Sequence, residues 1–321
     1  MAARYISTSQ PIQTHYVKIE YSASIQKPKI SVILPAYNSA KTICQQLEAL
    51  AKQDTSEHWE LVVVDDCSTD ETTKVVIGMQ DLFPYNKLIS TPRQGGAALA
   101  RNWGARNACG ELLLFCDADD IVAVDWISEM NKSLRNEVAA VGGQIDEYAL
   151  NDARHLAWRP PLMTKGLPIG WWYLPYALTG NFGIKADIFW ALGGFDETLR
   201  NGIDVDFSWR LQLIGEKLEF APNAIVFVRH RQDLLSSMRQ AYNWGAVSVE
   251  LVRRFHRDGM DAPRISPARI RLLALATHLF EVLKGEIPQA AWLRQCAYEW
   301  GIVVGYLHSK IFFRARASSG H

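Results

Sequence analysis

Residues 111–120 read ELLLFCDADD, an apolar run that leads directly into three carboxylates. Two further runs resemble it, ISVILP at 30–35 and ELVVVD at 60–65. Short apolar runs rich in β-branched residues are typical of buried strands. Segments with helical spacing lie between them, at 41–52 and at 97–108. This alternation predicts a parallel sheet whose strands are joined by right-handed crossovers.

The loops that follow these strands indicate where a ligand would bind. In an open sheet of this kind, ligands bind beyond the carboxyl ends of the strands. The loops after Leu34, Val64 and Cys116 all lie at that edge. The carboxylates at 117–120 are therefore expected to line a binding crevice.

The rest of the chain is predicted to extend the sheet and then to become helical. Strand-like segments are expected at 87–90, 139–144 and 217–228, order is expected to restart at 180–186, and helices are expected at 187–192 and 203–213. Residues 150–175 are rich in Trp, Pro and Tyr without clear periodicity, which favours a loop region that folds over a site. From residue 233 onward the pattern is mostly helical.

Composition excludes several classes of protein. Lys and Arg total 34, as do Asp and Glu, so the chain has no net charge that would favour nucleic acid as a partner. The five cysteines are odd in number and lack CxxC spacing, so we expect buried thiols in a reducing compartment. There is no signal-like start and no run of ~18 apolar residues. We therefore expect a cytoplasmic protein, with peripheral contact to the inner face of the cell membrane as a further option.

Asp117 and Asp119 form an Asp-x-Asp pair after a predicted strand. In extended backbone, side chains two residues apart point to the same side. Two convergent carboxylates suit a hard divalent cation, Mg²⁺ or Mn²⁺, that also binds phosphate oxygens. The alternative is that these acidic residues fill a turn or cap a helix.

Two other acidic pairs also follow or begin predicted elements. Asp65 and Asp66 end a strand, and they could instead cap the helix that follows. Asp204 and Asp206 lie at a predicted helix start, where the helix dipole alone favours acidic residues.

Six segments in this order resemble the family 2 inverting glycosyltransferases. They read SVILPAYN (31–38), VVVDDCSTD (62–70), GGAALARNWG (95–104), FCDADD (115–120), GGFDE (193–197) and DVDFSWR (204–210). The resemblance covers roughly residues 30–230. It implies an α/β fold of the GT-A (Rossmann-like) type, with a mixed sheet flanked by helices and a C-terminal helical appendage. The expected divisions are an irregular extension (1–28), a GT-A domain (29–232, with nucleotide-binding half 29–120 and acceptor-binding half 121–232) and a helical region (233–321).

The resemblance also implies roles for single residues on the nucleotide side. The residues implied to bind the nucleotide sugar are Pro35, Ala36 and Tyr37 beside the base, Asp66 on the pyrimidine, Arg101, and Asp117 near the ribose. Asp119 is implied as the direct metal ligand, with Asp117 and His230 as further candidates. His230 could equally be an ordinary surface histidine.

On the acceptor side the resemblance assigns the general base to Asp204, the second residue of the family's Glu-Asp pair. Two positions depart from the family pattern: Ile203 replaces the Glu of that pair, and Cys67 replaces the glycine of VDDGSTD.

The function expected from this resemblance is inverting, non-processive transfer of a hexose to a hydroxyl acceptor. The donor would be a UDP-, dTDP- or GDP-linked sugar, and the acceptor a glycan or a lipid-linked molecule. Surface polysaccharide, glycolipid or glycan assembly is the expected setting. Two alternatives remain: a catalytically weakened GT-A protein that binds or scaffolds carbohydrate, and a Mg²⁺-dependent nucleotidyltransferase.

Overall fold

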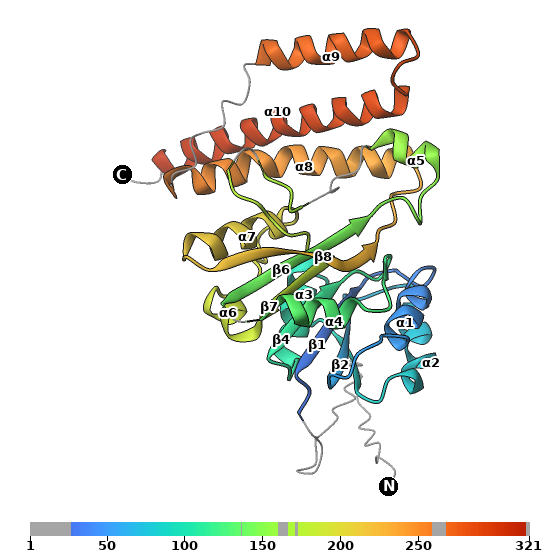
Figure 1. Ribbon diagram of the computed structural model, residues 1–321. Helices are drawn as coiled ribbons and strands as arrows, with labels where there is room; N and C mark the ends of the chain where they lie inside the picture. Colours follow the sequence, from blue (N-terminus) through green and yellow to red (C-terminus); the bar gives the residue numbers. More distant parts are fainter. Residues whose placement is uncertain (1–26, 136, 160–165, 171–172, 259–267, 319–321) are drawn as a thin grey trace.

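An eight-stranded mixed sheet forms the centre of the molecule, in the order β3-β2-β1-β4-β7-β6-β8-β5 (Figure 1). The computed structural model describes residues 27–318 apart from 136, 160–165, 171–172 and 259–267. The strands are β1 (Ile30–Ala36), β2 (Trp59–Asp65), β3 (Asn86–Ser90), β4 (Leu112–Cys116), β5 (Ile121–Val122), β6 (Val138–Asp146), β7 (Asn181–Lys185) and β8 (Lys217–Phe227).

The N-terminal half of the sheet is parallel, as the sequence predicts. β1 lies between β2 and β4, and β2 also pairs with β3; all three pairings are parallel. The ordered segment expected at 180–186 contains β7, which runs antiparallel to β4 and makes the sheet mixed. Ile30, Val32 and Leu34 are fully buried, because helices cover both faces of the strand they lie on.

Helices cover the two faces of the sheet in separate layers. They are α1 (Ile43–Ala51), α2 (Thr72–Gly78), α3 (Gly96–Asn107), α4 (Trp126–Ser133), α5 (Ala153–Trp158), α6 (Ala186–Ala191), α7 (Ile203–Leu213), α8 (Leu234–Phe255), α9 (Ala268–Leu283) and α10 (Gln289–Ser318), with short 3-10 turns at Gln80–Leu82 and His256–Asp258. Apolar side chains of α1, α2 and α4 share one buried cluster with the sheet, and those of α3, α6, α7 and α8 share the other. The sheet is thus the middle of three layers.

The C-terminal helices extend away from the sheet (Figure 1). α8 buries Leu251 and Phe255 against the sheet layer, α10 packs along α8, and α9 is outermost. The α8–α10 contact is close because it is built on glycines: a Cβ on Gly245 would lie 2.0 Å from the backbone oxygen of Tyr298. Within the described residues, no helix combines the length and the apolar character needed to span a bilayer.

Three sequence-based expectations differ from the structure or lie outside it. The predicted loop region at 150–175 contains α5, which begins where the Asp152 carboxylate accepts the backbone N–H of His155; lack of apolar periodicity concealed this short capped helix. The predicted N-terminal extension lies almost wholly outside the described residues, as do Trp171 and Trp172. The five cysteines are free thiols, but only Cys116 is buried, so the expectation of buried thiols is wrong for the other four.

Candidate active site

A cavity of 840 Å³ opens at the carboxyl ends of β1, β2 and β4, and we call it the carboxyl-end cavity. Seven residues predicted as site residues line it: Pro35, Ala36, Tyr37, Asp66, Arg101, Asp117 and Asp119. Its opposite wall comes from the segment between α6 and α7, including Glu197 and Arg200. The structure therefore brings the predicted residues from four separate segments into one space.

Asp66 holds the entrance of α3 to the end of β2. Its carboxylate accepts hydrogen bonds from the Thr91 hydroxyl (2.8 Å) and from the backbone N–H groups of Gly95 (3.0 Å) and Gly96 (2.8 Å). The carboxylate is thus placed at a helix N-terminus, where negative charge is stabilised. Asp65 instead closes its own turn by accepting the N–H of Ser68. Neither residue caps α2, the helix that follows them, so the capping alternative is wrong for that helix, and Asp66 faces the cavity.

Three carboxylates meet where β4 ends. Oxygens of Asp117, Asp119 and Asp120 all lie within 4.8 Å of one another. Gln46 of α1 fixes their turn, because its side chain donates to the Asp117 carbonyl and accepts the N–H of Val122. The turn thus positions three oxygen ligands on one side, which fits a hard divalent cation.

The electrostatics of this group also favour a cation. Burial raises the pKa of the Asp119 carboxyl, and repulsion from Asp117 adds to the rise. Burial raises the pKa of the Asp120 carboxyl still further, with repulsion from Asp119 next in importance. Carboxylates that are costly to ionise together are stabilised by a bound cation, which supplies the missing positive charge.

Positively charged neighbours partly balance the group but do not cover it. The buried Arg101 forms an ion pair with Asp117, and its Nε has no partner within the described part of the chain. The backbone N–H of Arg229 donates to Asp120 (3.0 Å), and the exposed Arg231 guanidinium is 4.0 Å from Asp119. Asp119 is 43% exposed, so its carboxylate is open to a ligand.

Asp204 lies in the first turn of α7, near this group. Burial raises the pKa of its carboxyl; the positive charge of Arg101 opposes the rise, and the negative charge of Asp117 adds to it. Asp204 is thus within the electrostatic reach of Arg101 and Asp117, although it is not among the residues that line the carboxyl-end cavity. A raised pKa suits a carboxylate that accepts a proton.

The structure does not place His230 with the carboxylates. His230 is buried, and its Nε2 lies 2.9 Å from Glu147. Among the described residues, the group with metal-binding geometry consists of Asp117, Asp119 and Asp120. The third carboxylate is thus Asp120, and His230 is not part of the group. A histidine after a strand near Asp-x-Asp was a plausible ligand, but the packing of Glu147 holds the imidazole elsewhere.

Sequence reasoning missed other residues of this site. Asp120 and Arg229 are adjacent to predicted site residues and carried a visible signal, the runs DADD and RHR. Gly180 carried none: a Cβ there would lie 2.7 Å from Asp117 and 3.6 Å from Asp120, so only glycine leaves room beside the carboxylates. That contact joins the start of β7 to the end of β4, and it exists only in three dimensions.

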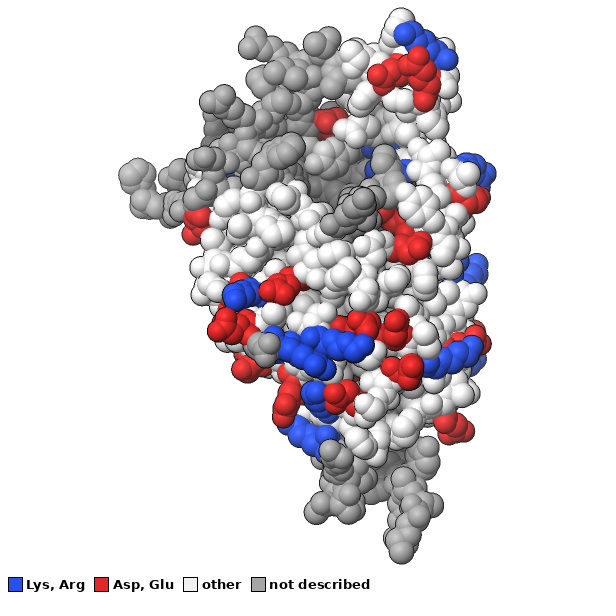
Figure 2. Space-filling model, viewed as in Figure 1, with Lys and Arg blue, Asp and Glu red and all other residues white. Residues whose placement is uncertain are grey.

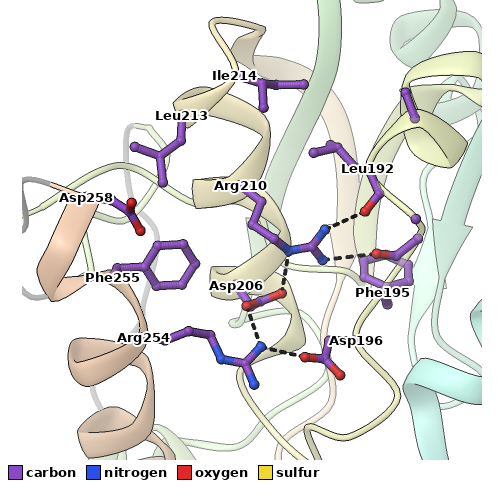
Figure 3. Close-up of a pocket in the computed structure, with 13 residues that line it drawn as sticks. Leu192, Phe195, Asp196, Asp206, Arg210, Leu213, Ile214, Arg254, Phe255 and Asp258 are labelled. Carbon is purple, nitrogen blue, oxygen red and sulfur yellow. Dashed lines mark hydrogen bonds and ion pairs between the residues drawn. The ribbon is translucent and has the colours of Figure 1, made fainter.

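A second cavity, of 660 Å³, lies between α7 and the end of α8, and we call it the α7–α8 cavity (Figure 3). Arg210 donates to Asp206 (2.8 Å) and to two backbone carbonyls, and Arg254 pairs with both Asp206 and Asp196 (3.0 and 2.5 Å). Figure 3 shows these side chains pointing at one another across the cavity wall. Asp206, two residues from Asp204, therefore serves an ion-pair network on another side of α7.

Comparisons with known proteins agree with this geometry. Residues 31–193 match a family model described as Glycosyl transferase family 2. The poly(ribitol-phosphate) beta-N-acetylglucosaminyltransferase TarS of Staphylococcus aureus is 39% identical over 121 residues, covering 37% of this chain and 19% of TarS. The validoxylamine A glucosyltransferase of Streptomyces hygroscopicus is 28% identical over 225 residues, covering 60% of this chain and 53% of that protein. The chain thus spans about a fifth to about half of the length of these curated relatives.

Two solved structures share the fold. The mannosyltransferase PcManGT from Pyrobaculum calidifontis, in complex with GDP-Man and Mn²⁺, aligns with a TM-score of 0.61 at 22% identity, covering 86% of this chain and 87% of that one. S. aureus TarS 1-349 in complex with UDP-GlcNAc aligns with a TM-score of 0.54 at 20% identity, covering 88% and 92%. The predicted GT-A architecture, a mixed sheet flanked by helices with C-terminal helices added, is confirmed.

Proposed function

Because this chain belongs to glycosyl transferase family 2, we propose that it transfers a hexose from a nucleotide-sugar donor to a hydroxyl acceptor, with inversion at the anomeric carbon. The observation that carries this proposal is the carboxyl-end cavity, in which Asp66, Arg101, Asp117 and Asp119 face one space. Relatives whose names include donors or sugars support the reaction class: GDP-Man and UDP-GlcNAc occupy two structures of the same fold.

We propose that the nucleotide binds across the ends of β1 and β2. Pro35, Ala36 and Tyr37 flank the base; Tyr37 is 47% exposed and free to contact a ring. Asp66 accepts from the base, since a carboxylate has lone pairs beyond the three bonds it makes here. Arg101, with its unpaired Nε, faces the diphosphate.

Asp117, Asp119 and Asp120 are proposed to hold Mn²⁺ or Mg²⁺. Three carboxylate oxygens within 4.8 Å fit such an ion, and Gly180 keeps a side chain out of the space beside them. When bound, the ion supplies positive charge to the departing diphosphate. Mn²⁺ in the PcManGT complex supports this choice of ion class.

Asp204 is proposed as the general base. An inverting transfer is a single displacement, so it needs a carboxylate that takes the proton of the attacking hydroxyl and no protein nucleophile. Its raised pKa favours that role. Ile203, in the place of the family's Glu, is buried at 6% exposure, so the first position of the pair supports α7 packing here.

The setting proposed is polysaccharide, glycolipid or glycan assembly, by a non-processive enzyme. TarS, named for poly(ribitol-phosphate), and the putative teichuronic acid glycosyltransferase TuaG of Bacillus subtilis support it. We also propose the division into a nucleotide-binding half (29–120), an acceptor-binding half (121–232) and a helical region (233–321). The match to glycosyl transferase family 2 and the clustered carboxylates favour transfer over a scaffolding or nucleotidyltransferase role.

We further propose that the helical region contacts an anionic membrane surface. Apart from Arg294, which lies in the interior between α8 and α10, residues 264–321 carry seven Lys or Arg and only three Asp or Glu, although the whole chain is neutral. Exposed apolar side chains lie on the same helices: Leu279, Phe280 and Leu283 on α9, and Trp300, Val303 and Leu307 on α10. The face in Figure 2 mixes both signs of charge over the sheet layers and also at the top, over the helices. The exposed Lys284 lies beside Phe280, with its Nζ 4.5 Å from the ring centre, and apolar area beside positive charge fits an anionic lipid surface.

Vesicle sedimentation tests this contact. Anionic vesicles should bring the protein down and zwitterionic ones should not, and the double variant Leu283→Glu with Trp300→Glu should abolish sedimentation. A concentration-dependent dimer that the same variant disrupts would instead assign this surface to a second copy of the chain and exclude the membrane proposal.

The transferase proposal is tested by a thermal-shift screen of UDP-, dTDP- and GDP-sugars with Mn²⁺ or Mg²⁺, followed by a transfer assay with the donor that binds. Asp204→Asn should retain donor binding and lose transfer by at least about 100-fold, the usual contribution of a general base. Retained transfer would remove Asp204 from that role. If no donor binds with either metal, the enzymatic proposal is wrong.

A further inference from the structure

Several buried polar side chains outside the carboxyl-end cavity have nitrogen atoms without a hydrogen-bond partner in the described part of the chain. In the described part of the chain, five buried side-chain nitrogens lack a hydrogen-bond partner. One is Arg101 Nε, which faces the proposed diphosphate site. The other four belong to Arg159, His230 and Arg294. Unpaired buried donors are rare in folded proteins because they forfeit their bonds with water, so four in one place require a reason.

These residues form one cluster with Glu147 and Trp244, which we call the arginine cluster. Glu147 contacts His230 Nε2 at 2.9 Å and an Nη of Arg159 at 3.0 Å. The guanidinium carbons of Arg159 and Arg294 lie 5.1 and 5.4 Å from the ring centre of Trp244. The cluster thus joins the end of β6, the end of α5, α8 and α10.

The arginine cluster holds more positive than negative charge. Burial lowers the pKa of Arg294 to about 10, and repulsion from Arg159 adds to that effect. Burial also lowers the pKa of Arg159, although attraction to Glu147 opposes it. Two guanidiniums that repel each other thus share one carboxylate, Glu147, and Asp120 adds only a weaker attraction on Arg159.

A purely structural arginine pair behaves differently in the same molecule. In the α7–α8 cavity, Arg210 and Arg254 meet two carboxylates and two carbonyls (Figure 3). No buried guanidinium nitrogen of that pair is without a partner in the part of the chain described. Packing alone therefore does not account for the unpaired nitrogens of Arg159 and Arg294.

The arginine cluster flanks the proposed reaction centre on the acceptor side. The charge of Asp120 acts on the Arg159 guanidinium. The Tyr176 hydroxyl is within the electrostatic reach of both Arg159 and Asp204. An anion held by Arg159 and Arg294 would accordingly belong to a molecule that approaches Asp204.

We propose that Arg159 and Arg294, supported by Trp244 and His230, bind a phosphoryl group of the acceptor substrate. A phosphoryl group offers three oxygens and negative charge to the three unpaired guanidinium nitrogens. That the group is carried by the acceptor rests on the proposed transferase function, whereas the binding of phosphate itself does not.

Calorimetric titration of inorganic phosphate tests the site, using protein saturated with nucleoside diphosphate and Mn²⁺ so that the carboxyl-end cavity is filled. Wild-type protein should bind phosphate, and Arg159→Gln and Arg294→Gln should each weaken binding at least tenfold. Arg154→Gln is the matched control, because Arg154 also stacks on a tryptophan, Trp158, but is exposed and outside the cluster. Absence of phosphate binding, or unchanged binding in both variants, would overturn the proposal.

The melting temperature gives a second test, because it should change in opposite directions for a phosphate-binding arginine and for a structural one. In phosphate-free buffer, Arg294→Gln should raise the melting temperature, because it removes a buried charge that lacks a partner. A structural arginine would give a lower melting temperature and would contradict the proposal. Should Arg294→Gln not fold, Arg294→Lys replaces it: this variant keeps the charge, loses the fork of donors and should bind phosphate several-fold more weakly.

Competition distinguishes the sources of the phosphoryl group. Displacement of phosphate by glycerol 3-phosphate, with no effect of glycerol, would indicate a soluble phosphorylated acceptor. Displacement by vesicles containing phosphatidic acid would indicate a lipid-linked one. If no nucleotide binds the protein, the transferase proposal fails, but the phosphate site can still be tested. Phosphate binding that is lost in Arg294→Gln and kept in Arg101→Gln would establish it as a second, separate site.

Discussion

The carboxyl-end cavity and the α7–α8 cavity contain the same kinds of side chain in opposite electrostatic states. In the α7–α8 cavity, burial opposes ionisation of Asp196, but hydrogen bonds from Thr198 and Arg254 prevail and lower its pKa to about 2. In the carboxyl-end cavity, burial and mutual repulsion raise the pKa of Asp119 and Asp120. Carboxylates that are matched by arginines stabilise the fold, whereas carboxylates crowded against one another indicate a place for a cation.

The loops near the two cavities also differ in which residues adopt left-handed conformations, although Gly96 does so in the wall of the carboxyl-end cavity. Near the α7–α8 cavity, left-handed conformations fall on Gly193 and Gly194, which adopt them without strain. In the loops after β1 and β2, they fall on Asn38 and Cys67, with φ of 48° and 61°. Non-glycine residues in this region store strain, and such strain concentrates where ligands bind.

The largest expected effect comes from Asp119→Ala. Loss of one of three clustered carboxylates should abolish metal-dependent donor binding, reducing affinity by more than about 100-fold, because even indirect partners of a metal contribute 10–100-fold. Isothermal titration of the donor with Mn²⁺ measures it. Asp196→Ala, in the other cavity, should leave metal-dependent binding intact. Equal losses in both variants would erase the distinction between the cavities.

The converse change is Asp206→Asn. Asp206 is fully buried and binds both Arg210 and Arg254. Its neutralisation removes the carboxylate paired with Arg210 and one of three paired with Arg254, which keeps Asp196 and Glu250. We expect a loss of about 2 kcal/mol in unfolding free energy, discounted because both guanidiniums are partly exposed. Urea denaturation measures it, with Glu137→Gln, from the exposed pair with Lys217, as the control that should not change stability. A stable Asp206→Asn protein would show that the ion pairs contribute nothing to folding.

Sequence reasoning found the parallel half of the sheet and the donor-side residues because both depend on local signals. The apolar runs that became β1, β2 and β4 end next to the residues that line the carboxyl-end cavity, so periodicity and chain position were sufficient. The roles of those residues stay predictions until they are measured.

The remaining features depend on contacts between distant segments. Arg159 and Arg294 are 135 positions apart and meet only because α10 packs along α8. The imidazole of His230 is held by Glu147, from another strand end, and no local pattern indicates that pairing. Asp204 and Asp206 look equivalent in sequence, yet the turn of α7 directs them to different surroundings.

A smaller effect is expected from pH. Because the pKa values of Asp119 and Asp120 are raised in the folded state, the folded protein binds protons more tightly than the unfolded chain. This contribution to stability is complete below the ordinary carboxyl pKa and is lost as pH rises through the raised values. Mn²⁺ should therefore raise the melting temperature increasingly from pH ~5 to pH ~8, as metal replaces protons. Asp119→Ala should remove that increase, and a Mn²⁺ effect independent of pH would contradict it.

The smallest expected effect concerns Cys67, which stands where the family has glycine. At φ 61° a residue with a Cβ is strained, and a left-handed conformation costs about 1–2 kcal/mol. Glycine removes that strain, but it also raises the conformational entropy of the unfolded chain, and this offsets part of the gain in stability. We therefore expect Cys67→Gly to stabilise the protein by about 0.5–1 kcal/mol, measured by urea denaturation. Cys67→Ala, which removes the thiol and keeps the Cβ, is the control and should not stabilise. Stabilisation by Cys67→Ala would show that the effect comes from the sulfur and its contact with Thr91. The loop after β2 would then be no more strained than the glycine turns beside the α7–α8 cavity.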